Sequence, residues 1–282
     1  ELVMASDPDA DRVGAAVKNN EGEWVLLNGN QTALMFVYYL IIRWKELGKI
    51  NGKEYIVKTI VTTETIKTIA ERNGVEMYDV YTGFKWIANV MRENEGKKNY
   101  IGGGEESYGF LCEDFVRDKD AVSACVILAE IAAWAKDQGL SLYQLLQKIY
   151  VEYGFSKEKG ISVVKKGKSG AEEIEAMMKK FRENPLTEIA GSKVTYFYDY
   201  STLKGKDYAE NETVTLDMPT TSNVLQYFTE DNTKVSIRPS GTEPKIKFYC
   251  EVHSKVKSID ELPEAEKAAE EKINQIKASL GI

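Results

Sequence analysis

Two hydrophobic periods alternate along the first 154 residues, one of about two residues and one near 3.6, as strands and helices respectively require. Apolar and β-branched runs predict strands over 1–5, 13–17, 54–61 and 75–81, and a pair of short strands within 99–114. Apolar stripes with polar starts and glycine ends predict helices over 28–47, 64–74, 82–94, 119–139 and 141–154. Strands that alternate with helices favour a mixed-sheet α/β architecture.

The pattern changes near residue 155, where we place a domain boundary. After the polar segment 154–160, the sequence predicts in order a strand over 161–165, a charged helix over 171–183, several short strands between 193 and 252, and a last helix from Pro263. This order favours a smaller α+β domain, in which helices flank an antiparallel sheet.

Composition narrows the possible functions. A chain of 282 residues exceeds the usual size of one core, so two domains are expected. Its net charge of −7 argues against a general nucleic-acid binder. The apolar run 33–42 is too short to span a membrane. Three cysteines without disulfide or metal spacing, and no secretory signal peptide, favour a cytoplasmic location.

The first chemical motif is "SDPDADR", residues 6–12. Asp7, Asp9 and Asp11 recur at every second position, so an extended loop could bring their carboxylates together around a hard cation such as Mg²⁺. The alternative is a solvated acidic turn. The neighbouring guanidinium of Arg12 favours the metal site, because a guanidinium beside a metal can bind a phosphoryl group. A calcium-binding EF-hand loop would need a glutamate where Lys18 stands.

A second motif, "RPSGTEPKIKFY" at 238–249, predicts a turn between two strands. Gly241 lets the backbone amides turn inward, and the hydroxyls of Ser240 and Thr242 could then surround an anion together with Arg238. Lys247 on the following strand adds a second positive charge. An ordinary hairpin turn is the alternative interpretation.

Two weaker motifs lie between them. In "GGGEESYG" (102–109), Glu105 and Ser107 could share a face and bind vicinal sugar hydroxyls, although a plain glycine-rich turn would look the same. In "TGFK" (82–85), Lys85 falls in the first turn of a predicted helix, where the helix dipole disfavours a cation. It is therefore either exposed or matched by an anion, and it is a candidate acid/base.

In this order the four motifs resemble those of the α-D-phosphohexomutase superfamily, which contains phosphoglucomutases and phosphomannomutases. The resemblance implies a four-domain enzyme in which a phosphoserine exchanges its phosphoryl group with glucose 1-phosphate through glucose 1,6-bisphosphate, giving glucose 6-phosphate. It divides this chain into the tail of a metal-loop domain (1–27), a sugar-binding domain (28–154) and a phosphate-binding domain (155–282).

The resemblance also implies a role for each motif. Asp7, Asp9 and Asp11 would bind Mg²⁺, and Arg12 would support the phosphoryl group. Gly83, Glu105 and Ser107 would contact the sugar. The other phosphate would be held by Arg238, Ser240, Gly241, Thr242 and Lys247.

Two departures from the superfamily qualify these roles. Many members have a histidine at the end of the sugar motif, where this chain has Gly109, so proton transfer falls to Lys85. The Thr-Ala-Ser-His-Asn-Pro-like loop that carries the reactive serine is not in the sequence. We therefore expect a carboxy-terminal portion that needs further amino-terminal domains and is inactive alone. A phosphomannomutase, a non-catalytic sugar-phosphate-binding module and a Ca²⁺-binding protein are the alternatives.

Overall fold

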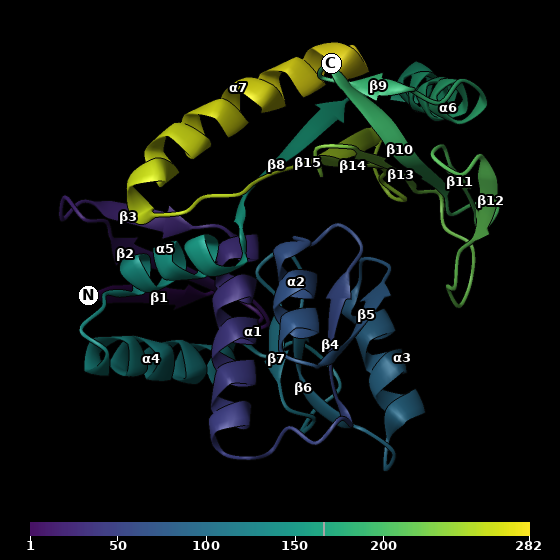
Figure 1. Cartoon of the computed structure of the whole chain (residues 1–282). Coiled ribbons are helices and arrows are strands. Elements are labelled where there is room, and N and C mark those ends of the chain that lie inside the picture. Colours follow the sequence, from purple (N-terminus) through teal and green to yellow (C-terminus); the bar gives the residue numbers. More distant parts are fainter. Residues whose placement is uncertain (166) are drawn as a thin grey trace. The chain divides into compact units, whose positions relative to one another are not determined.

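The computed structural model describes residues 1–165 and 167–282 (Figure 1). It divides into two compact units. Unit 1 comprises Glu1–Phe155 and Val256–Ile259, and unit 2 comprises Ser156–Lys255 and Asp260–Ile282. Among the described residues, no helix combines the length and the apolar character needed to cross a lipid bilayer.

Unit 1 contains two sheets. The first is antiparallel, in the order β1-β2-β3, with strands β1 (Leu2–Ser6), β2 (Val13–Lys18) and β3 (Trp24–Leu27). The second has the order β5-β4-β6-β7, with strands β4 (Glu54–Thr59), β5 (Glu76–Val80), β6 (Asn99–Gly104) and β7 (Phe110–Cys112). The helices of unit 1 are α1 (Gly29–Glu46), α2 (Thr65–Arg72), α3 (Phe84–Asn94), α4 (Ala121–Asp137) and α5 (Leu142–Tyr153).

The four-stranded sheet is mixed and lies between helices. Strand β4 pairs in parallel with β5 and β6, whereas β7 runs antiparallel to β6. Tyr55 and Val57 on one face pack with Phe84 and other residues of α3. On the opposite face, Gly102 lies so close to Leu40 of α1 that a Cβ on this glycine would be 3.1 Å from the leucine side chain. The predicted mixed α/β architecture is confirmed.

Helix α1 begins in a way that fixes the turn after β6. Asn28 forms a capping box with Gln31, in which each side chain accepts a hydrogen bond from the other residue's backbone amide, at 2.8 and 3.0 Å. A Cβ at Gly29, the next residue, would lie only 2.0 Å from the carbonyl oxygen of Glu106. Only glycine allows the start of the helix to approach the turn so closely.

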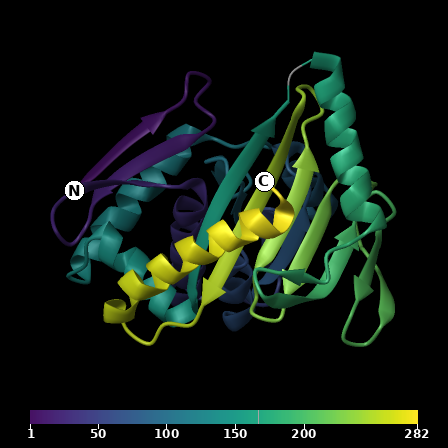
Figure 2. The same ribbon diagram turned by 90° about the horizontal axis from the view of Figure 1, so that it is seen from above.

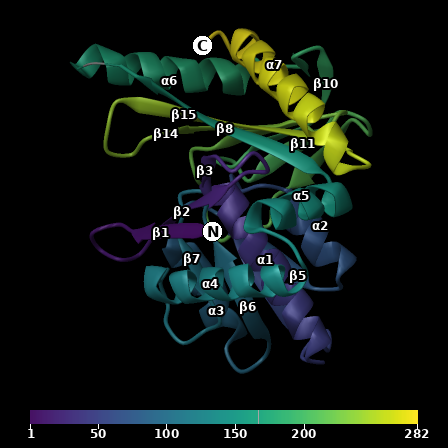
Figure 3. The ribbon, with the colours of Figure 1, turned by 90° about the vertical axis from the view of Figure 1, so that its left-hand side faces the viewer.

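Unit 2 is a sheet with two helices on one face (Figures 2 and 3). The order is β12-β11-β10-β13-β14-β15-β8, with β9 beside β10, and the pairings from β12 to β15 are antiparallel. Its strands are β8 (Phe155–Val164), β9 (Glu188–Ile189), β10 (Ser192–Asp199), β11 (Lys204–Asp207), β12 (Glu212–Thr215), β13 (Leu225–Thr229), β14 (Lys234–Pro239) and β15 (Lys245–Ser254). Helices α6 (Gly167–Glu183) and α7 (Leu262–Leu280) flank it, as the predicted α+β domain requires.

Two local predictions were wrong, and one strand was not predicted. The polar segment 154–160 is mostly part of β8, where Lys157, Glu158 and Lys159 follow one another and remain partly exposed on both faces of the strand. Gly102 and Gly103 lie inside β6 and not in a turn, since close packing against neighbouring residues leaves no space for a Cβ. Strand β3 was not foreseen, because it is short and its tryptophan and leucine face outward.

Candidate active site

The aspartates of the loop between β1 and β2 converge. Asp7, Asp9 and Asp11 each offer one carboxylate oxygen, and these atoms lie within 4.8 Å of one another. One oxygen of Asp7 accepts hydrogen bonds from the backbone amides of Asp11 at 3.1 Å and Arg12 at 3.0 Å, which close the loop. Burial alone would raise the pKa of Asp7, but these hydrogen bonds outweigh it and hold the pKa below its ordinary 3.8. Asp7 is therefore ionised at neutral pH.

The two oxygens of Asp11 have different surroundings. Oδ2 forms an ion pair with Lys119 Nζ at 2.7 Å. Oδ1 is buried and has no hydrogen-bond donor in the described part of the chain, although Arg12 Nε lies 3.6 Å away. Buried polar atoms are normally hydrogen-bonded, and a carboxylate oxygen without a donor suits a hard cation. The chemistry of this donor set therefore fits Mg²⁺.

The aspartate loop is joined to the "GGGEESYG" turn by backbone contacts. Arg12 forms an isolated antiparallel bridge with Gly109, and the amide of Val13 donates to the carbonyl of Tyr108 at 3.2 Å. The loop also meets the start of α4, where the amide of Ala121 donates to the carbonyl oxygen of Ala10 at 3.0 Å. Two motifs that are almost 100 residues apart in the sequence thus form one structure.

The candidate sugar residues lie in the turn that follows β6. Glu105 is buried, with 7% of its surface exposed, and its Oε1 accepts a hydrogen bond from the backbone amide of Gly83 at 2.8 Å. Ser107 is half-buried in the same turn. Tyr108 has a positive φ of 72°, a conformation that L residues adopt infrequently, and its side chain is exposed. The turn thus brings Glu105 of one motif to Gly83 of another.

Lys119 was not identified from the sequence, and its position is linked to Gly109. A Cβ on Gly109 would lie 2.5 Å from Cδ of Lys119 and 3.4 Å from Oε2 of Glu105. A histidine at position 109 would therefore collide with the lysine. The one indication in the sequence was Gly109 itself. It stands where many superfamily members have a histidine, so another basic side chain could be expected to occupy that space. Nothing near Lys119 in the sequence shows that it reaches Asp11.

Lys85 stands at the start of α3 with its side chain exposed. Its Nζ lies 5.1 Å from the centre of the Trp86 ring, and no carboxylate pairs with it in the described residues. Gly83, which precedes the helix, has a φ of 111° and so turns the chain where a side chain would be strained. The sequence left open whether Lys85 is exposed or paired with an anion, and in the structure it is exposed.

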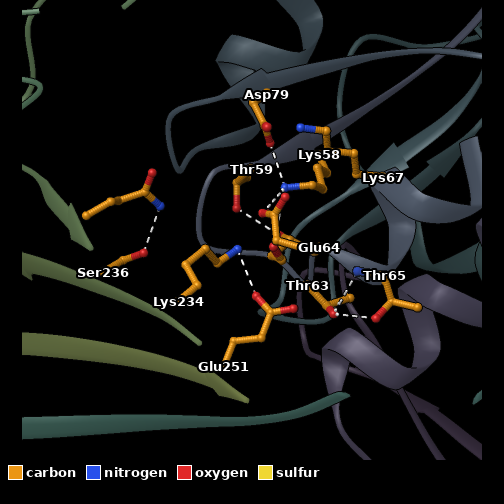
Figure 4. A network of polar contacts seen from close by, with 12 residues as sticks. Lys58, Thr59, Thr63, Glu64, Thr65, Lys67, Asp79, Lys234, Ser236 and Glu251 are labelled. Carbon is orange, nitrogen blue, oxygen red and sulfur yellow. Dashed lines mark hydrogen bonds and ion pairs between the residues drawn. The ribbon is translucent and has the colours of Figure 1, made fainter. Parts of the chain in front are cut away.

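A buried lysine supports the ends of the parallel strands (Figure 4). Lys58 is 1% exposed, and its Nζ pairs with Asp79 at 2.6 Å and with Glu64 at 2.9 Å. Lys58 and Asp79 are direct neighbours in the β4–β5 register. The next residue of β4, Thr59, donates a hydrogen bond from Oγ1 to Oε2 of Glu106 at 3.3 Å. The ends of β4 and β5 are thereby tied together and to the sugar turn, a connection that the sequence motifs did not indicate.

In unit 2, the "RPSGTEP" motif forms the turn between β14 and β15. Ser240 Oγ accepts hydrogen bonds from the amides of Thr242 at 3.3 Å and Glu243 at 3.2 Å, and it lies 3.5 Å from Thr242 Oγ1. Ser240, Gly241 and Thr242 also line a cavity of about 970 Å³ between this turn and one face of α6. The two hydroxyls therefore lie side by side, at one wall of an open space.

The two predicted cations of this motif form a second group. Arg238 and Lys247 are opposite each other in the β14–β15 register, so their side chains share one face of the sheet. Phe248, the neighbour of Lys247, packs against Phe181 of α6, with ring centres 6.2 Å apart. Because side chains alternate along a strand, Arg238 and Lys247 lie on the face opposite α6. Neither residue lines the 970 Å³ cavity.

The same face of the sheet carries a buried charge network (Figure 4). Lys234 and Glu251 are register partners, are only 2% and 3% exposed, and form an ion pair at 2.8 Å. The other oxygen of Glu251 lies 2.7 Å from Nε2 of His253. Burial alone would lower the pKa of His253, but the carboxylate of Glu251 outweighs it and raises the pKa above 6.5.

Comparison with known proteins identifies both units. Residues 28–153 match the family model "Phosphoglucomutase/phosphomannomutase, alpha/beta/alpha domain III", and residues 162–269 match the "C-terminal domain" of the same family. A phosphoglucomutase of Staphylococcus aureus (strain MRSA252) is 38% identical over 249 residues, which are 88% of this chain and 44% of that protein. A phosphoglucomutase of Staphylococcus haemolyticus is 34% identical over 252 residues, or 89% of this chain and 45% of that protein.

A solved structure of a phosphoglucomutase has a similar fold. The open form of pp63/parafusin, a phosphoglucomutase from Paramecium, superimposes with a TM-score of 0.61 at 18% identity. The match covers 97% of this chain and 45% of the Paramecium protein. The chain therefore spans about half the length of the relatives that it matches, and it corresponds to their carboxy-terminal portion.

Proposed function

Because the chain belongs to the phosphoglucomutase/phosphomannomutase family, we propose that it is the carboxy-terminal portion of a phosphoglucomutase. Such an enzyme is an isomerase that interconverts glucose 1-phosphate and glucose 6-phosphate through glucose 1,6-bisphosphate. In this proposal, residues 1–27 end a metal-loop domain, residues 28–154 bind the sugar and residues 155–282 bind a phosphate. The curated relatives named above are phosphoglucomutases, which favours glucose over mannose.

The observation that carries the proposal is the junction between the aspartate loop and the sugar turn. The bridge from Arg12 to Gly109 and the hydrogen bond from the amide of Val13 to the carbonyl of Tyr108 hold the proposed hard-cation site and the proposed sugar-binding turn together within unit 1. A phosphoryl-transfer enzyme needs this proximity, because its catalysis rests on positioning and charge neutralisation around the transferred group. A protein that only binds Ca²⁺ would have no need of the sugar turn.

Asp7, Asp9 and Asp11 would hold Mg²⁺, as their converging oxygens and the donor-free oxygen of Asp11 support. Bound there, the metal would neutralise negative charge on the phosphoryl group. Arg12 adds a fixed positive charge that can support the same group. Lys119 pairs with Oδ2 of Asp11, so it orients one of the three proposed metal ligands.

The sugar would be bound by the turn that contains Glu105 and Ser107. The hydrogen bond from the amide of Gly83 fixes the carboxylate of Glu105, which can then accept hydrogen bonds from two sugar hydroxyls. Gly83 leaves the backbone close to the substrate without a side chain between them. We assign proton transfer to Lys85, whose exposed ammonium group has no carboxylate partner in the described residues.

The second phosphate would be bound in unit 2. Arg238 and Lys247 lie side by side on one face and supply two positive charges, of which the guanidinium can form two parallel hydrogen bonds to phosphate oxygens. The turn of Ser240, Gly241 and Thr242 adds hydroxyl and backbone donors at the end of the same strand pair. We propose that Arg238 and Lys247 grip the phosphate that is not being transferred, and that the turn residues, which line the cavity on the α6 side of the strand pair, close around the same ligand when it binds.

The phosphoryl donor is not among these residues. The family uses a serine in a Thr-Ala-Ser-His-Asn-Pro-like loop, and the 282-residue sequence does not contain this loop. We therefore propose that activity requires the amino-terminal domains of the same enzyme, and that the reaction takes place in the cytoplasm. The partners are then hexose phosphates and these domains, with neither nucleic acid nor membrane involved.

Calorimetry with the 282-residue protein tests the assignment of ligands. Arg238→Ala should weaken glucose 6-phosphate binding at least tenfold and leave Mg²⁺ affinity unchanged, whereas Asp9→Ala should abolish Mg²⁺ binding. Arg92→Ala, on the exposed part of α3, is the matched control for loss of an arginine. Equal glucose 6-phosphate affinity in Arg238→Ala and the unsubstituted protein would contradict the phosphate assignment.

The same preparations separate the alternatives. Tighter binding of mannose 6-phosphate than of glucose 6-phosphate would favour a phosphomannomutase. Turnover of glucose 1-phosphate by the chain alone, measured with a coupled dehydrogenase assay, would contradict the need for further domains. Absence of turnover after the amino-terminal domains are supplied would favour a non-catalytic sugar-phosphate-binding module.

A further inference from the structure

The loop between β6 and β7 contains one strained residue. The two strands are antiparallel, and the amide of Glu105 donates a hydrogen bond to the carbonyl oxygen of Gly109 at 2.8 Å, so a three-residue hairpin loop remains between them. The loop consists of Glu106, Ser107 and Tyr108. The last residue of such a loop typically has a left-handed conformation, for which glycine is favoured. In this chain that residue is Tyr108, with a φ of 72°.

Backbone contacts hold Tyr108 in this conformation. Its carbonyl oxygen accepts a hydrogen bond from the amide of Val13 at 3.2 Å. The start of α1 is also close, because a Cβ on Gly29 would lie only 2.8 Å from the amide nitrogen of Tyr108. The loop is thus fixed by the aspartate loop and by α1 together. A side chain at position 108 therefore has a conformational cost that glycine would not have.

The side chain of Tyr108 lacks the specific contacts that could explain this cost. It is 40% exposed, and in the described part of the chain its hydroxyl forms no hydrogen bond and its ring stacks on no other aromatic ring. Among the described non-glycine residues with a positive φ, Tyr108 is the only aromatic one. Backbone strain that persists in a folded protein is concentrated at functional sites, so this aromatic side chain points to a role in binding.

The neighbours of Tyr108 connect this role with the sugar. Tyr108 directly follows Ser107, and the carboxylate of Glu105 at the start of the loop is fixed by the amide of Gly83. Ligand sites commonly combine a few polar groups, which fix orientation, with an aromatic surface. Glu105 and Ser107 would bind hydroxyl groups at the edge of a hexose. The face of the hexose ring then requires an apolar partner, which Tyr108 can supply.

We propose that Tyr108 contacts the hexose, with its aromatic ring packed against the C–H groups on one face of the sugar. The inference rests on the proposed function and deepens it, because it names a residue that distinguishes glucose from mannose. The C2, C3 and C4 hydroxyls of glucose lie at the edge of the ring. In mannose the C2 hydroxyl is axial and protrudes from one face. An aromatic ring packed on that face would bury this hydroxyl without a hydrogen-bond partner.

Calorimetry with the 282-residue protein tests the inference. Tyr108→Gly should weaken glucose 6-phosphate binding by at least about fivefold and mannose 6-phosphate binding by less than about twofold, because only glucose packs against the ring. Tyr108→Phe should keep the glucose 6-phosphate affinity of the unsubstituted protein, since the ring and not the hydroxyl makes the contact. Equal losses for the two sugar phosphates in Tyr108→Gly would overturn the proposal. So would a loss in Tyr108→Phe as large as that in Tyr108→Gly.

Urea unfolding followed by tryptophan fluorescence distinguishes a binding role from a packing role. Tyr108→Gly should unfold at the same urea concentration as the unsubstituted protein or at a higher one, because it removes the strain. A lower midpoint would mean that the ring is needed for packing, which would overturn the proposal. Glu113→Gly is the matched control, because Glu113 is an exposed residue of unit 1 with a φ of 58° at the other end of β7. It should leave the affinity for both sugar phosphates unchanged.

Arg238→Ala, measured in parallel, separates this inference from the proposed function. If Arg238→Ala weakens glucose 6-phosphate binding and Tyr108→Gly does not, the proposed function stands and the role of Tyr108 is overturned. The reverse result would support the role of Tyr108 and contradict the phosphate assignment. If the unsubstituted chain binds neither sugar phosphate, the proposed function fails, and this inference fails with it.

Discussion

Gly29→Ala is the sharpest test of how the fold holds the candidate sugar turn. The new methyl group would lie 2.0 Å from the carbonyl oxygen of Glu106, where an ordinary contact is about 3.4 Å or more. The obstacle is backbone and not a flexible side chain, so relief requires the start of α1 and the sugar turn to separate. Overpacking of this kind typically costs about 1–3 kcal/mol, and a backbone obstacle belongs at the upper end.

A smaller term opposes this cost. Alanine in a helix is more favourable than glycine by about 0.5–1 kcal/mol. The expected net loss in the free energy of unfolding is therefore about 2 kcal/mol. The four tryptophans of the chain, Trp24, Trp44, Trp86 and Trp134, all belong to unit 1. Urea unfolding followed by tryptophan fluorescence thus reports on the unit that contains the substitution.

Gly14→Ala is the control within the same unit. A Cβ on Gly14 would meet its nearest neighbour, the carbonyl oxygen of Ala5, at 3.9 Å, which is an ordinary contact. Its stability should stay within about 0.5 kcal/mol of the unsubstituted protein. If Gly29→Ala unfolds at the same urea concentration as Gly14→Ala, the start of α1 does not hold the sugar turn.

Two further predictions concern buried charges. Lys58→Met strands two partly exposed carboxylates and should cost about 2–3 kcal/mol in the same fluorescence assay, whereas the exposed Lys67→Met should change stability by less than about 0.5 kcal/mol. Glu251 raises the pKa of His253 in the folded protein above 6.5. The stability that the protonated His253 contributes is therefore fully present below pH 6.5 and is lost as the pH rises through the pKa that His253 has in the folded state. Urea unfolding followed by far-ultraviolet circular dichroism, which reports on both units, should therefore give a lower free energy at pH 8 than at pH 6, whereas tryptophan fluorescence, which reports on unit 1, should show no such difference. His253→Gln should remove this dependence, and an unchanged pH profile in that variant would assign the dependence to another group.

The elements predicted from the sequence are those whose signal is local. Helices α1 and α5 begin at capping boxes, and strand β4 is rich in β-branched residues, so nearest-neighbour chemistry was sufficient. Strand β3 was not predicted because its exposed residues, Trp24 and Leu26, are apolar, so polar and apolar residues do not alternate along it as they do in most half-buried strands. The first part of β8, within 154–160, was not predicted, because a run of charged residues resembles a linker when the partner strand is unknown.

In the candidate site too, local arrangements could be predicted from the sequence and long-range contacts could not. The convergence of Asp7, Asp9 and Asp11 could be predicted because three carboxylates at alternate positions of one loop need no distant residue to approach one another. The pairing of Lys119 with Asp11 could not, because it depends on the bridge between the aspartate loop and the sugar turn. The buried Lys58 was likewise hidden, since its partners lie on the neighbouring strand and in the segment before α2.

In the structure, Gly109 ties the pairing of Lys119 with Asp11 to a single position of the sugar turn. Its missing side chain leaves the path that Lys119 follows to Asp11, so the glycine and the lysine depend on each other. Gly109→Ala should therefore displace Lys119, since the added methyl group would lie 2.5 Å from Cδ. If Lys119 orients Asp11 as proposed, calorimetry should then show a change in Mg²⁺ affinity similar to that caused by Lys119→Met. A change in Lys119→Met alone would mean that the lysine reaches Asp11 by another path, and no change in either variant would mean that Asp11 binds the metal independently of the lysine.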